Sequence, residues 1–234
     1  NFAGRVIPAG KVFAKRLARL AGPLTLSRHR TRLPAGVRRD LEQWLQFLSQ
    51  FNGTLLWREP WAPASQLALF TDAAGGDGFG AILGRKWCAA RWPISRVRAG
   101  VTKNITLLEL FPIVVAFTVW GQELCNKQVV LCSDNHAVVQ LVNNNSARCP
   151  KVLALLRRLV RSQLEGNIAV RARHVAGVHN DVADALSLVF SGIASGAWPP
   201  MQNIGVRPSW ESCGDWWNHF ELVGRRSFGT TDAG

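Results

Sequence analysis

The chain has 234 residues, of which 47% are hydrophobic and 18% charged, so it can bury a core and is not typical of a disordered protein. Its cysteines form no CxxC pair, which argues against structural zinc and a disulfide framework, and no apolar run reaches the roughly 18 residues of a membrane span. The formal net charge of +13 predicts a polyanionic partner, most simply a nucleic acid; a solvated basic surface is the alternative.

The positive charge is concentrated in the first two thirds of the chain. Residues 1–60 carry 11 basic and 3 acidic side chains, residues 61–190 carry 14 and 8, and residues 191–234 carry 3 and 4. Free thiols favour a reducing intracellular setting, either cytoplasm or nucleus, and we expect no membrane partner. Because the chain begins at Asn1 rather than Met and shows no signal-peptide pattern, we expect a piece of a longer polypeptide.

Residues 1–60 predict a small helical segment. GKVFAKRLARLAG places Phe13, Leu17 and Leu20 on one stripe of a helix. RRDLEQWLQFLSQFNG predicts a second helix that ends at Asn52-Gly53, and WREPWAPAS is typical of a linker. The expected apolar stripe of the second helix consists of Leu41, Trp44, Leu45, Leu48 and Phe51.

Residues 65–190 predict an α/β domain. LALFTDA, GFGAILG and KWCAARWP predict an antiparallel meander, and ITLLELFPIVVAFTVWGQEL predicts a long apolar helix that Pro112 should kink. KQVVLCSDN and NIAVRARHVAG predict two more strands, HAVVQLVNN and KVLALLRRLVRSQLEG predict two helices, and a last helix should begin near Asn180. The order βββαβααβα indicates a mixed sheet flanked by helices. We expect residues 191–234 to form an irregular tail.

Three acids stand where catalytic groups are often found. Asp72 and Asp134 each end an expected strand, and Glu109 is the lone charge of the apolar helix, where burial without a partner would be costly. If the two strands are neighbours, the three carboxylates meet, and oxygen-only ligation suits Mg²⁺ or Mn²⁺. Each acid also has an ordinary interpretation. Asp72 could be a turn aspartate, Asp134 with Asn135 could be an N-cap, and Glu109 could be a chance acid.

The stretch HVAGVHNDVADALS adds a histidine and two aspartates, Asp181 and Asp184, one helical turn apart. From the residues alone, it could be a capped helix start, a metal site, or one corner of a larger site. His174 alone is more often an ordinary hydrogen-bonded histidine.

These blocks together resemble the motifs of a ribonuclease H domain. FTDAAGGDGFGAIL, ITLLELFPIVVAF, VVLCSDNHAVVQLV and HVAGVHNDVADALS match that family in order and in element type. The resemblance implies a ribonuclease H-like α/β fold with a five-stranded mixed sheet, preceded here by the helical segment. It also implies four metal-binding, catalytic acids, Asp72, Glu109, Asp134 and Asp184, with Asp181 left as a first-turn acid after an Asn180 cap.

The family's activity is hydrolysis of the RNA strand of RNA–DNA hybrids. The resemblance implies that Asp72 bridges two Mg²⁺ ions, that Asp184 helps to hold the ion on the attacking-water side, and that Glu109 and Asp134 hold the other. His174 would assist proton transfer or product release. We expect the substrate to be bound by the following residues: Asn135, Asn180, Arg171, Arg173, Lys15, Arg16 and Arg19.

The sequences of the motifs most resemble those of retroelement ribonuclease H, in particular that of DIRS-type retrotransposons, which use a tyrosine recombinase. NFAGRVIPAGKVFAKRL and RRDLEQWLQFLSQFNGTLLW resemble the thumb and connecting region of the same elements' reverse transcriptase, so the rest of that polyprotein is an expected partner. The chain has no tyrosine and therefore no polymerase YxDD signature.

The chain departs from the family's pattern in two places, and two rival interpretations stay open. NNNSARCP joins two helices directly, where family members that act alone often have a basic protrusion, so residues 1–60 or the polyprotein must help to grip the substrate. The chain has ALSL where the family usually has ALSR. The rivals are another nuclease or integrase of the same fold, and a degenerate retroelement remnant that binds nucleic acid without cleaving it.

Overall fold

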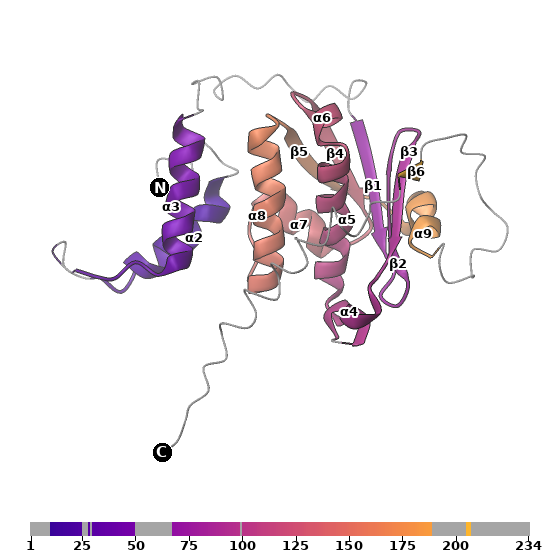
Figure 1. The fold of residues 1–234 in the computed structure, drawn as a ribbon. Coiled ribbons are helices and arrows are strands. Elements are labelled where there is room, and N and C mark those ends of the chain that lie inside the picture. The colour runs from indigo at the N-terminus through magenta and orange to yellow at the C-terminus, as the bar shows by residue number, and fades with distance from the viewer. Residues whose placement is uncertain are drawn as a thin grey trace, which may run out of the picture.

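A mixed sheet of six strands lies at the centre of the protein (Figure 1), and the computed structural model describes residues 10–24, 28, 30–49, 67–98, 100–188 and 205–206. The order across the sheet is β5-β4-β1-β2-β3-β6. In chain order the strands are β1 Leu67–Ala73, β2 Gly78–Leu83, β3 Lys86–Arg91, β4 Gln128–Ser133, β5 Ala169–His174 and β6 Gly205–Val206.

The pairing of β1 with β4 brings two of the acids to one edge of the sheet. β1, β2 and β3 form an antiparallel meander, whereas β4 and β5 run parallel to β1. Parallel neighbours end at the same edge, and the register pairs Phe70 with Cys132. Asp72 and Asp134 each come two residues later, so their backbones lie level there.

Most of the helices cover one face of the sheet. On this face α5 packs on β1 and β2, α8 packs on α5, and α7 packs on β5, whereas α9 packs against β1, β2 and β3 on the opposite side (Figure 1). The helices are α4 Ile94–Arg98, η4 Val101–Lys103, α5 Ile105–Val119, α6 Gly121–Leu124, α7 His136–Asn144, α8 Pro150–Glu165, η5 Gly177–His179 and α9 Asp181–Ser187.

The core lies between the sheet and α5. This helix is apolar on all sides and buried along most of its length, and it continues through Pro112 as one helix. Phe111 packs edge-on against Phe79 of β2 and against Trp92, with ring centroids 5.3 and 5.4 Å apart. This packing fixes α5 across the strands, so the position of every side chain on α5 is set by the core.

Two N-terminal helices, α2 Lys11–Ala21 and α3 Ala35–Ser49, lie beside α8 (Figure 1). Their apolar stripes differ from those predicted. In α2 the buried apolar residues are Val12 and Phe13. In α3 the buried side chains are Val37, Asp40, Gln43, Trp44 and Phe47.

The reason for this correction is the buried Asp40. The predicted buried face of α3 was chosen by the spacing of its apolar residues, which cannot include a charged residue such as Asp40. The prediction therefore put the leucines on the buried face. Leu45 and Leu48 are in fact 69% and 49% exposed. Phe51, the Asn52-Gly53 end and the linker lie outside the described residues.

The predicted α/β class and the order βββαβααβα are confirmed, with short helices added before and after α5 and before α9. This is the ribonuclease H-like arrangement that the sequence resemblance implies. The sheet has one strand more than predicted, because Gly205–Val206 pairs with β3. The rest of the expected tail lies outside the described residues, and within them no helix is both long and apolar enough to cross a membrane.

Candidate active site

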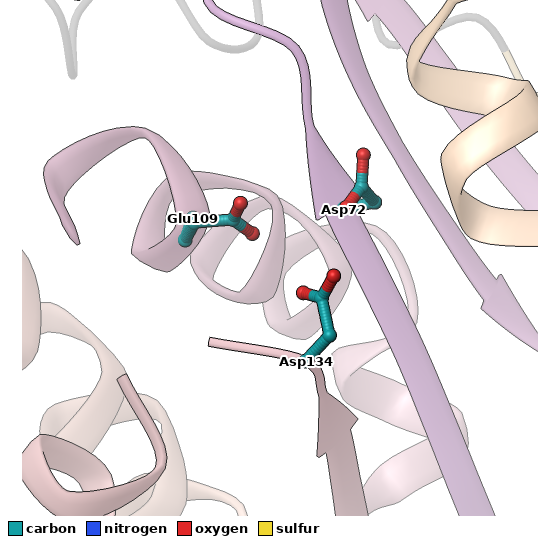
Figure 2. Close-up of side chains that lie close together, drawn as sticks. All are labelled: Asp72, Glu109 and Asp134. Atoms are coloured by element: carbon teal, nitrogen blue, oxygen red, sulfur yellow. The ribbon is translucent and has the colours of Figure 1, made fainter. Parts of the chain in front are cut away.

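Three carboxylates meet at the edge where β1 and β4 end. Asp72 lies on β1, Asp134 directly follows β4, and Glu109 reaches toward them from α5 (Figure 2). One oxygen atom from each side chain can be chosen so that all three lie within 4.8 Å of one another. The cluster predicted from strand ends and a lone helical acid is therefore present.

Glu109 is held in place by the helix that carries it. Asn104 caps α5, its side chain accepting a hydrogen bond from the Leu107 amide at 3.1 Å. One turn further along, Glu109 is only 6% exposed, and its Oε2 atom has no hydrogen-bond partner among the described residues. A buried, unpartnered carboxylate oxygen is costly unless a proton or a cation binds it.

The electrostatics of the cluster favour protonation. Burial raises the pKa of Glu109 to about 9, and the charges of Asp72, Asp134 and Asp184 add to the shift. Burial also raises the pKa of Asp72 to about 6; a hydrogen bond with Ser187 opposes this shift, and Asp184 and Asp134 increase it. The three carboxylates can all be ionised at neutral pH only if positive charge is supplied.

Asp184 lies outside this three-acid group. It is exposed on α9 and reaches the cluster by charge, raising the pKa of both Asp72 and Glu109. The Ser187 hydroxyl donates to the Asp184 carbonyl oxygen at 2.8 Å, and because it has one hydrogen, it can donate to either this carbonyl or Asp72. The role of Asp184 as a fourth metal ligand stays a prediction.

Gly80 explains how α9 comes so close to β1, the strand that carries Asp72. It pairs with Asp72 across β1 and β2. A Cβ atom on Gly80 would lie 2.4 Å from the Cβ of Leu186 and 2.8 Å from the Ala183 carbonyl oxygen. Only glycine lets α9 pack onto this point of the sheet. This role was not predicted from the sequence, although the GFG pattern that follows the first acid was the available signal.

The side chain of Asn180 does not form the helix cap that we predicted. It precedes α9, but the side chain makes no capping hydrogen bond. Instead, Asn180 is 2% exposed and its amide donates to the Thr71 carbonyl oxygen at 3.2 Å, next to Asp72. Asn180 therefore ties α9 to β1, and its contact with substrate stays a prediction.

His174 lies at the end of β5, beside Asp134. Its backbone pairs with Ser133, and its Nε2 atom is 3.0 Å from the Asp134 carbonyl oxygen. The ring is exposed and lies flat against the ring of His136, the first residue of α7. His136 was not identified from the sequence, since a histidine at the start of a helix carries no signal by itself.

Asn135 caps α7, as the alternative for Asp134-Asn135 proposed. Its side-chain oxygen accepts from the amides of Ala137 and Val138 at 3.0 and 3.3 Å. The cap involves Asn135 alone, which leaves the Asp134 carboxylate for the cluster. Asn135 is partly exposed, and a substrate contact by it stays a prediction.

The basic residues proposed to bind substrate divide into two groups. Arg171, Arg173, Lys15 and Arg19 are exposed. Arg16, whose side chain is partly exposed, donates to the Gly36 carbonyl oxygen at 3.2 Å and pairs with Asp40 at 3.5 Å, which joins α2 to α3. Substrate binding by these basic residues stays a prediction.

Comparison with known proteins finds similarity to solved structures alone. No family model matches the chain, and no curated protein matches it. It is similar to ribonuclease H1 from the halophilic archaeon Halobacterium salinarum, with 16% identity and a TM-score of 0.39, over 53% of this chain and 97% of that one.

Two further ribonuclease H structures are similar to the chain. The N-terminal ribonuclease H domain of rv2228c from Mycobacterium tuberculosis has 14% identity and a TM-score of 0.41, over 56% of this chain and 97% of that one. LC11-RNase H1, isolated from compost, has 14% identity and a TM-score of 0.40, over 52% and 92%. At such low identities, the activity has to be argued from the site itself.

Proposed function

We propose that the chain is a divalent-cation-dependent endonuclease that hydrolyses the RNA strand of RNA–DNA hybrids. The observation that carries the proposal is the cluster of Asp72, Glu109 and Asp134 with its buried, unpartnered Glu109 oxygen. A strongly basic chain (net charge +13) that places such a cluster at a sheet edge suits a phosphodiester substrate.

The residues fit Mg²⁺ or Mn²⁺ because every available ligand atom is a carboxylate oxygen. Asp72, Glu109 and Asp134 would hold the cations, and Asp184, carried close by α9, would complete the set. When bound, two such ions stabilise the charge on the attacking and leaving oxygens of a phosphodiester. Ionisation of Glu109 and Asp72 would accompany cation binding, because the positive charge stabilises both carboxylates and offsets the effect of burial and of the neighbouring acids on their pKa.

The protein's own groups around the cluster supply positioning and proton handling. His174 donates from Nε2 to a carbonyl, so its neutral ring carries the free lone pair on Nδ1 and can take up or release a proton there. RNA is distinguished from DNA by its 2′-hydroxyl groups and by the shape of the minor groove, so we expect little sequence preference.

For substrate grip we propose the exposed bases on α2 together with Arg171 and Arg173 on β5. Lys15 of α2 donates a hydrogen bond to the Ser146 hydroxyl in the connection between α7 and α8. Through this contact, α2 lies beside the connection between α7 and α8. Family members that act alone often have a basic protrusion at this connection, and this chain has none in its sequence. Phosphate contacts of this kind make binding fall steeply with added salt.

The cellular context is proposed from the sequence resemblance. The chain would be the ribonuclease H part of a retroelement reverse transcriptase, most like that of DIRS-type elements, and would act together with the rest of that polyprotein. Removal of RNA template after DNA synthesis is the step that such an activity serves.

One observation favours a second candidate, a nucleic-acid-binding module without activity. Asp184, the fourth expected cation ligand, is exposed and lies outside the three-acid group. A remnant that has lost cation binding would still keep the basic surface and the fold. The binding module and the nuclease are separated by their chemistry, since both would retain a hybrid but the nuclease alone would cut it.

The test is cleavage of a hybrid labelled on its RNA strand, with Mg²⁺, by the full chain and by Asp72→Asn. We expect products from the wild type, loss of more than about 100-fold in Asp72→Asn, and no products with a chelator. Cleavage of duplex DNA in place of the hybrid would indicate another nuclease of this fold. Tight retention without cleavage by either protein would establish the binding module.

A further inference from the structure

Two histidines from different elements form a parallel stack beside the three-acid cluster. The rings of His136 and His174 have centroids 3.6 Å apart and planes inclined by 6°. Both side chains are exposed. An exposed side chain is normally free to change rotamer, so a face-to-face contact between two of them needs an explanation in the way each is held.

His174 is held at one ring edge by a hydrogen bond. A carbonyl oxygen can only accept, so the 3.0 Å contact between Nε2 and the Asp134 carbonyl oxygen requires the hydrogen to be on Nε2. This single bond leaves the ring able to pivot about its axis. A flat partner against the ring face limits that rotation, because a ring turned out of the shared plane would collide with it.

His136 stands on a well-held piece of backbone at the start of α7. The Asn135 cap bonds to the two amides that follow His136, at 3.0 and 3.3 Å. Further along α7, Asn143 both donates to and accepts from the backbone of Ala172 at 2.9 Å, which ties α7 to β5. Both rings of the stack therefore stand on one locked unit, α7 with β5.

We propose that His136 is a positioning residue for the hydrolysis, and that its ring holds the imidazole of His174 in a fixed plane next to Asp134. The inference rests on the proposed function, because His174 is a catalytic group only if the cluster hydrolyses a phosphodiester. His136 acts through His174 and needs its flat face for this role, not its nitrogen atoms.

The experiment compares His136→Ala, which removes the ring, with His136→Phe, which keeps a flat ring without nitrogen. With the full chain, Mg²⁺ and labelled hybrid, we expect His136→Ala to lower kcat about three- to tenfold, a part of the effect of a positioned acid or base. KM should stay within about twofold, and His136→Phe should restore kcat to within about twofold of the wild type. His179→Ala, an exposed histidine outside the stack, is the matched control and should change neither constant.

A double-mutant cycle tests whether His136 acts through His174. In a His174→Ala background, His136→Ala should cause no further loss, because the group that it positions is gone. An equal additional loss would overturn the proposal, as would a His136→Phe variant as impaired as His136→Ala, which would mean that a nitrogen of His136 acts itself. An unchanged kcat in His136→Ala would also overturn it.

A readout without activity separates this inference from the proposed function. A stacked ring changes the magnetic field at its neighbour. The chemical shifts of the His174 ring protons should therefore change in His136→Ala, and in His136→Phe they should still show the effect of a stacked ring. If the chemical shifts of the His174 ring protons are the same in the wild type and in His136→Ala, the stack is absent, whatever the activity. Wild-type protein that shows the stack but cuts no hybrid refutes the proposed function, and the positioning role falls with it.

Discussion

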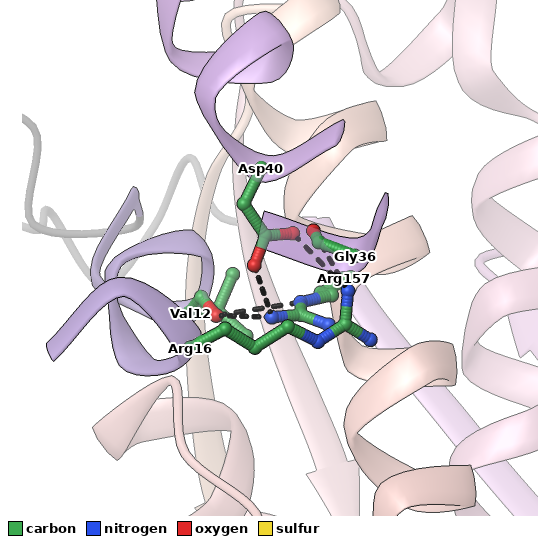
Figure 3. Close-up of polar contacts among 5 residues, drawn as sticks. All are labelled: Val12, Arg16, Gly36, Asp40 and Arg157. Carbon is green, nitrogen blue, oxygen red and sulfur yellow. Dashed lines mark hydrogen bonds and ion pairs between the residues drawn. The ribbon is translucent and has the colours of Figure 1, made fainter. Parts of the chain in front are cut away.

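Arg157 on α8 and Asp40 on α3 form a buried ion pair across 117 positions of sequence, with 2.9 Å between Nη2 and Oδ2 (Figure 3). The same guanidinium donates to the Val12 carbonyl oxygen of α2 from Nε and Nη2, at 3.4 and 3.3 Å. One side chain of α8 therefore joins both N-terminal helices. The division of domains at residues 60–65 stays a prediction; α2 packs on both α3 and α8, and the Arg157–Asp40 pair joins α3 to α8.

The ionisation of this pair shows what it contributes. Burial lowers the pKa of Arg157 to about 10 and raises the pKa of Asp40, and in each case the partner's charge opposes the shift. The cost of removing water thus exceeds the attraction for both groups. Such a pair specifies where the helices dock more than it adds net stability.

We predict that Arg157→Ala lowers the free energy of unfolding by about 3–5 kcal/mol, because it leaves Asp40 charged and buried without its main partner. Urea unfolding of the full chain measures this loss. Arg161→Ala, an exposed arginine on the same helix, should cost less than about 0.5 kcal/mol.

The double variant Asp40→Leu/Arg157→Met should recover most of the stability, since apolar side chains can fill the same space. If Arg157→Ala and Arg161→Ala cost the same, the buried pair does not hold the N-terminal helices to α8.

We predict that Gly80→Ala destabilises the protein by about 1–3 kcal/mol and also weakens hybrid cleavage, because the new methyl group forces α9 away from the sheet. The cleavage loss should exceed what the unfolded fraction explains, since Asp184 moves with α9. Gly76→Ala is the control, because a Cβ there would meet nothing within 4 Å. Urea unfolding and kcat measured on the same preparations test both effects; equal behaviour of the two variants would contradict the packing argument.

We predict that Asp184→Asn lowers kcat by about 10²-fold or more, as expected for loss of a charge that helps to hold a catalytic cation. Asp181→Asn should retain activity within about threefold. Asp181 lies in the same turn of α9 and is also exposed, but its carboxylate accepts from the adjacent Val182 amide, and its charge is not among those that raise the pKa of Asp72 or Glu109. Rates on labelled hybrid at saturating Mg²⁺ decide the assignment, and a comparable loss in both variants would overturn it.

The sequence predicted the cluster because the relevant signals are local. An acid at the end of an apolar strand, and a lone Glu109 in an apolar helix, indicated candidates, and their joint occurrence in the order of the ribonuclease H motifs favoured one site over the ordinary interpretation of each acid. The meeting of Asp72 with Asp134 was expected on the condition that their strands are neighbours, and the parallel pairing of β1 with β4 meets that condition.

The features that the sequence did not predict depend on contacts between distant residues. The buried face of α3 is set by Arg157, more than 100 positions away, and no helical periodicity contains that information. The His136–His174 stack and the close approach of α9 at Gly80 likewise exist only once the sheet and helices are assembled. Asn180 was predicted as a cap from its position, but a carbonyl of β1 takes its amide instead.

The raised pKa of Glu109 makes stability depend on pH when no divalent cation is bound. Its pKa rises from 4.5 to about 9 on folding, so the folded state holds a proton that the unfolded state has lost. The contribution of this bound proton to the free energy of unfolding is fully present below about pH 4.5 and is lost as the pH rises through about 9. Asp72, raised from 3.8 to about 6, adds a loss at lower pH.

In a chelator, the stability of the wild type relative to Glu109→Gln should therefore fall steadily between about pH 5 and about pH 9. Glutamine keeps the shape of the side chain and cannot ionise, so this difference isolates Glu109 from other titrating groups. Mg²⁺ should restore the wild type at the alkaline end and help the variant less, because the wild type alone offers the full set of carboxylates. Urea unfolding across this range measures the trend, with the exposed Glu165→Gln as the control. A difference that stays flat with pH, or that Mg²⁺ leaves unchanged, would contradict the assignment of Glu109 as a buried cation ligand.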